Sequence, residues 1–261
     1  SMNISLFVDL HGWLAGAAIC FARLAPIFFM LPFLNSRALT GAPRNAVIVL
    51  VGMALWPYTA DTLPRLDSLG FYGLLLREAG VGVVLGCLLS WPFWVLHGMG
   101  NLIDNQRGAM LSSTVDPANG DDTSELANFL QMFAAVIYLE AGGMGLVVET
   151  LGRSYQLCSP LHGCELRVQP LLGLLDPLVS KTLIISAPVV ATLLLSEALL
   201  GLLARFAPQM NAFSMSLTVK GAIALLVLLL YFGAHLPSEI QRMGRDKPAQ
   251  LVDWFIQPVA R

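Results

Sequence analysis

Residues 171–206 read LLGLLDPLVSKTLIISAPVVATLLLSEALLGLLARF, and this stretch decides the fold class. Leucine, isoleucine, valine and alanine dominate it, and charged residues are sparse. A helix needs about 20 predominantly apolar residues to cross the hydrocarbon core of a bilayer. The stretch is longer than that, and Pro177 and Pro188 each remove a backbone donor from it. It therefore predicts a long, membrane-class helical segment with proline kinks.

Further apolar runs lie on both sides of this stretch. They cover residues 4–34, 46–57, 71–98, 126–150 and 212–236, and the run 46–57 is short for a simple span. Hydrophobic residues make up 56% of the chain and charged residues only 12%, whereas an average soluble domain carries about 25% charged residues. We predict an all-α, membrane-class fold of kinked helical hairpins over residues 1–236, followed by a polar tail over residues 237–261.

The charges bear on partners and on topology. The net charge is −2 and no basic patch is present, so nothing indicates nucleic-acid binding. Positive residues cluster in the tail at Arg242, Arg245, Lys247 and Arg261, which favours a cytoplasmic tail. The other loops do not alternate in charge. We therefore expect some apolar hairpins to pack against protein instead of lipid.

Motifs for catalysis are absent from the sequence. There is no His-Glu-x-x-His, no P-loop and no Gly-x-Ser-x-Gly, and the four histidines are scattered. We therefore expect no enzymatic activity, no cofactor and no metal. Cys158 and Cys164 flank a short loop that contains His162. This pair is a disulfide if the loop faces an oxidising compartment, a pair of free thiols, or half of a metal site with His162.

Small and ionisable residues inside the apolar runs indicate tight helix packing. Gly82 and Gly86 make a Gly-x-x-x-Gly spacing, which lets helix backbones approach closely. Ionisable residues at membrane depth are costly, so they pair or line a polar cavity. Glu197 and Arg205 are eight residues apart and lie near one face of a helix. They are either structural partners between helices or subunits, or parts of a proton relay.

Three blocks of sequence resemble the FliR/SctT family of export-gate proteins of bacterial type III secretion. The first runs from Arg23-Leu-Ala-Pro26 through Pro43-Arg44 to Trp56-Pro57. The second is Glu78 with Gly82 and Gly86, followed by the segment 100–108, GNLIDNQRG, and by Asp116-Pro117. The third contains Ala187-Pro188-Val189 and Glu197, then the segment 205–213, RFAPQMNAF, and Lys220. The third block is the most specific, although Thr218 stands where the family often has a proline.

This resemblance implies a place in an assembly. Family members join R-type and S-type small export-gate subunits in a helical ring, with a single copy of the family member. The resemblance also implies contact with the large export-gate subunit, the autocleaving switch protein, inner rod and needle proteins, and unfolded secretion substrates. It implies a multi-pass protein of the bacterial inner membrane, partly raised toward the periplasm. The injectisome branch is favoured over the flagellar branch.

The resemblance further implies which residues serve the gate. The segment 110–122 resembles the family's plug loop, which occupies the closed channel, although it could also be an ordinary connection. Its residues are Met110, Leu111, Ser112, Ser113, Thr114, Val115, Asp116, Pro117, Ala118, Asn119, Gly120, Asp121 and Asp122. Subunit packing or buried polar positions are expected at Arg23, Glu78, Gly82, Gly86, Asp104, Gln106, Glu197, Arg205, Gln209, Asn211 and Lys220.

We therefore expect a core subunit of the type III secretion export gate, part of the channel for unfolded proteins. The alternative is a proton-coupled secondary transporter or permease with Glu197 and Arg205 at its site. That alternative needs inverted repeats and regular spans, and neither is clear in the sequence.

Overall fold

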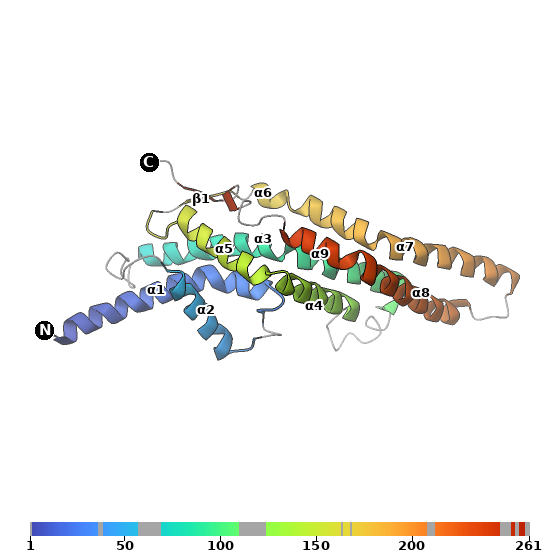
Figure 1. Ribbon diagram of the computed structural model, residues 1–261, viewed down its shortest axis with the longest axis horizontal. Coiled ribbons are helices and arrows are strands. Elements are labelled where there is room, and N and C mark those ends of the chain that lie inside the picture. The colour runs from blue at the N-terminus through green and yellow to red at the C-terminus, as the bar shows by residue number, and fades with distance from the viewer. Residues whose placement is uncertain are drawn as a thin grey trace. The chain divides into compact units, whose positions relative to one another are not determined.

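A computed structural model describes residues 2–35, 39–56, 69–109, 124–162, 164–167, 169–207, 212–245, 252–253 and 256–258. The described chain is built almost wholly from helices (Figure 1). In order these are α1 (Met2–Met30), α2 (Ala42–Ala54), α3 (Leu69–Arg107), α4 (Glu125–Glu140), α5 (Gly143–Leu157), α6 (Gln169–Leu172), α7 (Leu175–Phe206), α8 (Ala212–Ala234) and α9 (Leu236–Arg245). The prediction of an all-α, membrane-class fold is confirmed.

A short β ribbon completes the described chain, and the sequence did not predict it. Strand β1 (Cys164–Leu166) pairs antiparallel with β2 (Ile256–Pro258). Each strand has three residues, which is too short for the alternating pattern that reveals longer strands.

Four helical stretches are long and apolar enough to cross a membrane: Leu10–Met30, Leu69–Arg107, Leu175–Phe206 and Met215–Ala234. The predicted apolar run 126–150 does not form one continuous helix. It is broken between α4 and α5, where Gly142 has a φ of +86°. Glycine adopts this left-handed conformation at little cost, and it ends one helix before the next begins. The two shorter helices could together make a fifth, broken span.

The chain divides into two compact units. The first contains Ser1–Trp91, Gly142–Leu174 and Gly244–Arg261. Here α1 packs against α2, and β2 contacts both β1 and α5. The core contains Ile19, Leu24, Ile27, Leu85 and Leu88, whose side chains are almost fully buried. The first unit therefore gathers segments from the beginning, middle and end of the chain.

The second unit contains Pro92–Ala141 and Leu175–Met243. Its main feature is a hairpin of α7 and α8, which pack along each other (Figure 1). Phe93 and Tyr138 meet edge to face in its core, with ring centroids 5.2 Å apart. The predicted boundary at residue 236 follows another criterion, polarity along the chain, and stays a prediction.

Candidate functional site

A buried ion pair joins α1 to α3 in the first unit. Arg23 Nε donates to Glu78 Oε2 at 2.6 Å, and both side chains are fully buried. Arg23 Nη2 also donates to the carbonyl of Cys158 at 2.8 Å, and the guanidinium lies over the Tyr155 ring, 4.2 Å from its centroid. A buried charge is tolerated only with such partners. Arg23 thus connects α1 with α3 and with the end of α5.

Glycines on α3 let α1 come close enough for this pair to form. A Cβ atom at Gly82 would collide with the backbone carbonyl of Arg23. A Cβ atom at Gly86 would instead meet the flexible end of the Met30 side chain. The predicted Gly-x-x-x-Gly pair therefore lies on the helix face that contacts α1, and Gly82 is the position where backbone meets backbone.

The loop after α5 lies beside this ion pair and is closed by a disulfide between Cys158 and Cys164. Of the three alternatives that the sequence left open, the structure forms the disulfide. Arg77 Nη2 donates to the carbonyl of Pro160 at 2.6 Å, and it lies 3.4 Å from Glu78 Oε1. In the part of the chain that the structure describes, no group of three or more His, Cys, Asp or Glu could hold a metal.

A second buried polar group lies in the second unit, around Asp104 of α3. Asp104 is 2% exposed. Its Oδ2 accepts from Ser124 Oγ at 2.6 Å and from the Leu126 N–H at 3.3 Å, and its Oδ1 accepts from Arg107 Nε at 2.7 Å. Ser124 Oγ in turn accepts from the Ala127 N–H and is the N-cap of α4. Asp104 therefore fastens the end of α3 to the start of α4.

The same two helix ends touch directly at Gly100. A Cβ atom there would collide with the backbone of Ala127. The expected plug loop, residues 110–122, connects these helix ends but lies outside the described residues. Its two flanks are thus held together by one carboxylate and one close backbone contact.

A third polar group joins the hairpin of the second unit to α3. Lys220 Nζ lies 3.0 Å from Glu197 Oε1, and Gln106 Nε2 donates to Glu197 Oε2 at 3.2 Å. The Lys220 side chain is only 9% exposed, whereas that of Glu197 is 52% exposed. The partner of Glu197 is therefore a lysine on α8, and not the arginine two turns further along α7.

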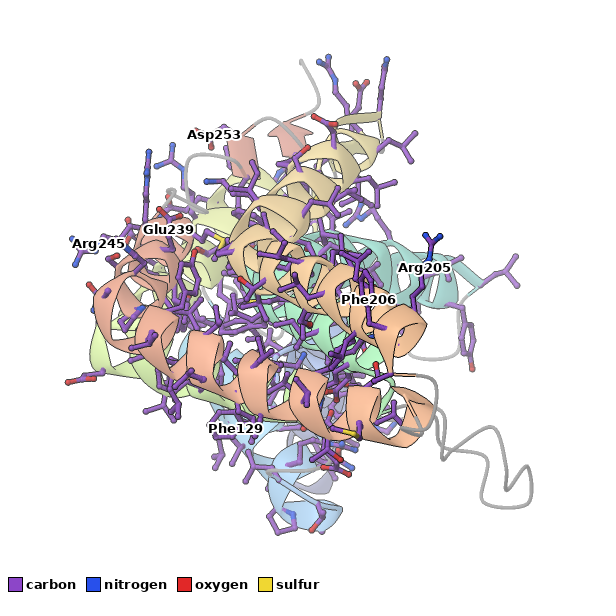
Figure 2. All side chains as sticks on the ribbon, turned by 90° about the vertical axis from the view of Figure 1, so that its right-hand side faces the viewer. Phe129, Arg205, Phe206, Glu239, Arg245 and Asp253 are labelled. Carbon is purple, nitrogen blue, oxygen red and sulfur yellow. A yellow bond between two sulfur atoms is a disulfide. The ribbon has the colours of Figure 1, made fainter. Side chains whose placement is uncertain are left out.

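The remaining predicted residues are spread over the end of the hairpin. Arg205 is exposed near the end of α7, and Figure 2 shows its side chain directed away from α8. Gln209 and Asn211 lie outside the described residues. The role of the predicted set in subunit packing stays a prediction.

Comparison with known proteins shows the family to which the chain belongs. The sequence model described as "Bacterial export proteins, family 1" matches residues 14–244. The chain belongs to this family. The match covers all three polar groups, which therefore lie within the part of the chain that the family model describes.

The names of the relatives of this export protein refer to surface presentation of antigens, to a secretion system apparatus and to flagellar biosynthesis. The surface presentation of antigens protein SpaR of Salmonella typhimurium strain LT2 is 54% identical over 256 residues, 98% of this chain and 97% of that protein. SpaR of Shigella flexneri is 44% identical over 237 residues, 91% and 93% of the two chains. The flagellar biosynthetic protein FliR of Pectobacterium carotovorum subsp. carotovorum is 24% identical over 252 residues, 93% and 96%.

These similarities confirm the predicted family, with the injectisome branch favoured over the flagellar one. They also confirm the predicted function in type III secretion export and give no support to a proton-coupled permease. The export protein is a membrane protein and works with other components of a secretion apparatus.

Sequence reasoning missed several residues that complete the sites. Ser154 and Tyr155 both face Arg23, and neither was singled out. A signal existed, because both are polar-tipped residues that follow the apolar run 126–150 and lie near the loop cysteines. The bond between Ser124 and Asp104 was also missed. That bond joins residues 20 apart across a loop, and no local spacing predicts it.

Proposed function

We propose that this export protein is a core subunit of the type III secretion gate and lines part of the channel through which unfolded polypeptides cross the bacterial inner membrane. The observation that carries the proposal is the family match over residues 14–244. The groups around Arg23, Asp104 and Lys220 support it, because each central charged side chain is held by a structural partner on another helix or at a helix cap. The protein acts as a conduit and performs no catalytic step of its own.

The proposed partners are the R-type and S-type small gate subunits, with one copy of this chain in a helical ring. Two leucines near the end of α8, Leu229 and Leu230, are 72% and 71% exposed. Exposed leucines on so apolar a helix need cover from lipid or from sister subunits. Further proposed partners are the large gate subunit, the autocleaving switch protein, inner rod and needle proteins, and the unfolded substrates. The ring is partly raised toward the periplasm.

Co-purification tests this assignment. When the chain is expressed with its neighbouring gate subunits, native mass spectrometry should find one copy of it in a multi-chain ring. A stable monomer that binds a small-molecule substrate would contradict the proposal and favour a permease.

We further propose that residues 110–122 plug the resting channel. The contacts of Asp104 and Gly100 support this, because they hold both flanks of the segment at one place. Deleting residues 110–122 should raise small-ion leakage through the assembled gate in cells or in vesicles. As a control, exchange of the same residues for a Gly/Ser linker of equal length separates plugging from chain connectivity. If leakage after the deletion equals that of the intact gate, the segment is an ordinary connection.

A further inference from the structure

The loop after α5 and the last described strand form one structure in the first unit. The disulfide joins Cys158, which follows the last residue of α5, to Cys164, which is the first residue of β1. In the ribbon, Cys164 lies opposite Pro258 and Leu166 lies opposite Ile256. The disulfide therefore fixes the start of the strand on which β2 is paired. We call residues 158–162 and 164–166, together with residues 252–253 and 256–258, the disulfide cap.

Two further contacts hold the C-terminal part of the cap against α5. Arg153 donates from Nε and Nη2 to the two carboxylate oxygens of Asp253, at 3.0 and 2.5 Å. Val252 and Ile256 on either side of Asp253 are fully buried. A bidentate ion pair flanked by buried apolar side chains is a fixed attachment, in contrast to a tail that lies free.

The loop part of the cap completes the buried ion pair. The carbonyls of Cys158 and Pro160 accept hydrogen bonds from Arg23 and Arg77. Both carbonyls lie in the loop that the disulfide closes. The conformation of this loop thus determines whether the buried guanidinium of Arg23 keeps one of its acceptors.

From these contacts we propose that the disulfide cap, including its residues 252–253 and 256–258, lies in the oxidising compartment on the periplasmic side of the membrane, and that Cys158 and Cys164 are oxidised there. Disulfides persist in the periplasm, whereas cysteines are kept as reduced thiols in the cytosol. Paired strands lie about 4.8 Å apart, whereas the hydrocarbon core is about 30 Å thick. Strand β2 must therefore share the compartment of β1.

This assignment opposes the count of positive charges, which favours a cytoplasmic tail. The charge rule is a statistical preference, whereas the ribbon and the Arg153–Asp253 pair are direct contacts. The inference rests on the proposed location in the inner membrane, because that location makes the two compartments the periplasm and the cytoplasm.

The oxidation is a balanced exchange with a named class of oxidant. The two thiols of Cys158 and Cys164 lose two protons and two electrons as their sulfur atoms bond. The electrons pass, through a mixed disulfide, to the active disulfide of a periplasmic thiol oxidase, which becomes a dithiol. Nothing else is consumed or released.

Thiol counting in cells that express the full gate tests the compartment of the loop. The chain has four cysteines, and two of them, Cys20 and Cys87, are free. After acid quenching and denaturation, a maleimide polymer should add two labels before reduction and four after it. In cells without the periplasmic thiol oxidase it should add four before reduction. Four labels before reduction in normal cells would overturn the proposal.

Protease accessibility tests the side on which the tail lies. An epitope tag placed on a flexible linker after residue 261 should be removed by protease added to intact spheroplasts. A tag that survives until the inner membrane is permeabilised places the tail in the cytoplasm and overturns the assignment. Secretion by the tagged gate is measured in parallel, so failure of the proposed export function is seen separately from failure of this placement.

Hydrogen exchange tests the link between disulfide and strand in the purified assembly. A disulfide of this kind shifts a local opening equilibrium by about 30-fold or more. Cys158→Ser with Cys164→Ser should therefore speed amide exchange at Ile256 and Gln257 by about that factor. Cys87→Ser removes a thiol elsewhere in the same unit and is the matched control. Unchanged exchange in the double variant, or equal acceleration in the control, would show that the disulfide does not hold the ribbon. If the double variant does not assemble, reduction of the intact wild-type assembly gives the same readout.

Discussion

Replacing Glu78 by glutamine tests whether the buried ion pair holds α1 against α3. The substitution preserves the shape of the side chain and removes only its charge. The Arg23 guanidinium then stays fully buried without its carboxylate. Breaking a buried pair on one side costs about 3–5 kcal/mol. The carbonyl of Cys158 and the Tyr155 ring still contact the guanidinium, so we expect the low end, about 3 kcal/mol.

The assay is thermal unfolding of the co-purified assembly in detergent, followed by size-exclusion chromatography. A change of 1 kcal/mol shifts the Tm of a chain of this size by about 2–4 °C, so Glu78→Gln should lower it by about 6–12 °C. The matched control is Glu149→Gln, the same substitution at an exposed position on α5. Arg23→Met combined with Glu78→Leu should recover most of the loss, because a packed apolar pair leaves no buried charge. If Glu78→Gln melts within about 1 °C of the Glu149→Gln control, the pair does not hold these helices together.

Other substitutions test the helix contacts and the remaining polar groups, each by the same Tm measurement. Gly82→Ala should prevent close packing of α1 and α3 and abolish assembly, whereas Gly73→Ala, where a Cβ atom meets nothing within 4 Å, should be neutral or slightly stabilising. Ser124→Ala should lose the α4 cap and about 1 kcal/mol, and Ser124→Thr should retain most of it; equal values for both would contradict the capping role. Glu197→Gln should cost about 2 kcal/mol, because it leaves the ammonium of Lys220 nearly buried without its carboxylate, and no change would show that the pair is solvated in the assembly.

The helices could be predicted from the sequence because apolar runs of this length have few other structures available in a membrane. The limits of the prediction are seen at Gly142. An apolar run with two adjacent glycines continues as one helix or breaks into two according to the backbone angle that tertiary packing imposes. Residues 175–206 show the opposite outcome, since α7 continues through Pro188 as one helix, although the start of the predicted run 171–206 belongs to α6. Local sequence therefore located the helices better than their ends.

The candidate site could be predicted as a set of residues but not as a set of pairs. Arg23, Glu78 and Asp104 were expected to be buried polar positions, and each is at most 2% exposed. Apart from the near neighbours Arg77 and Arg107, their partners lie 20 to 135 residues away along the chain. The expected neighbour of Glu197 shows why spacing misleads. Arg205 is on nearly the same face of α7, but two turns of helix separate the residues by about 12 Å, so Lys220 on α8 comes closer.

The buried arginine of α1 also imposes an order on synthesis. Arg23 leaves the ribosome well before Glu78, which lies 55 residues later, and before the carbonyl of Cys158, which lies 135 residues later. Until then, Arg23 lacks these partners, and an arginine within a lone membrane helix costs up to about 2.5–3.5 kcal/mol in the bilayer. The first helix therefore gains from waiting, at the insertion machinery or at the membrane surface, until α3 arrives beside it. The nascent chain therefore takes its final position in the membrane late. Truncated chains that end before Glu78 should be the ones that quality-control proteases degrade.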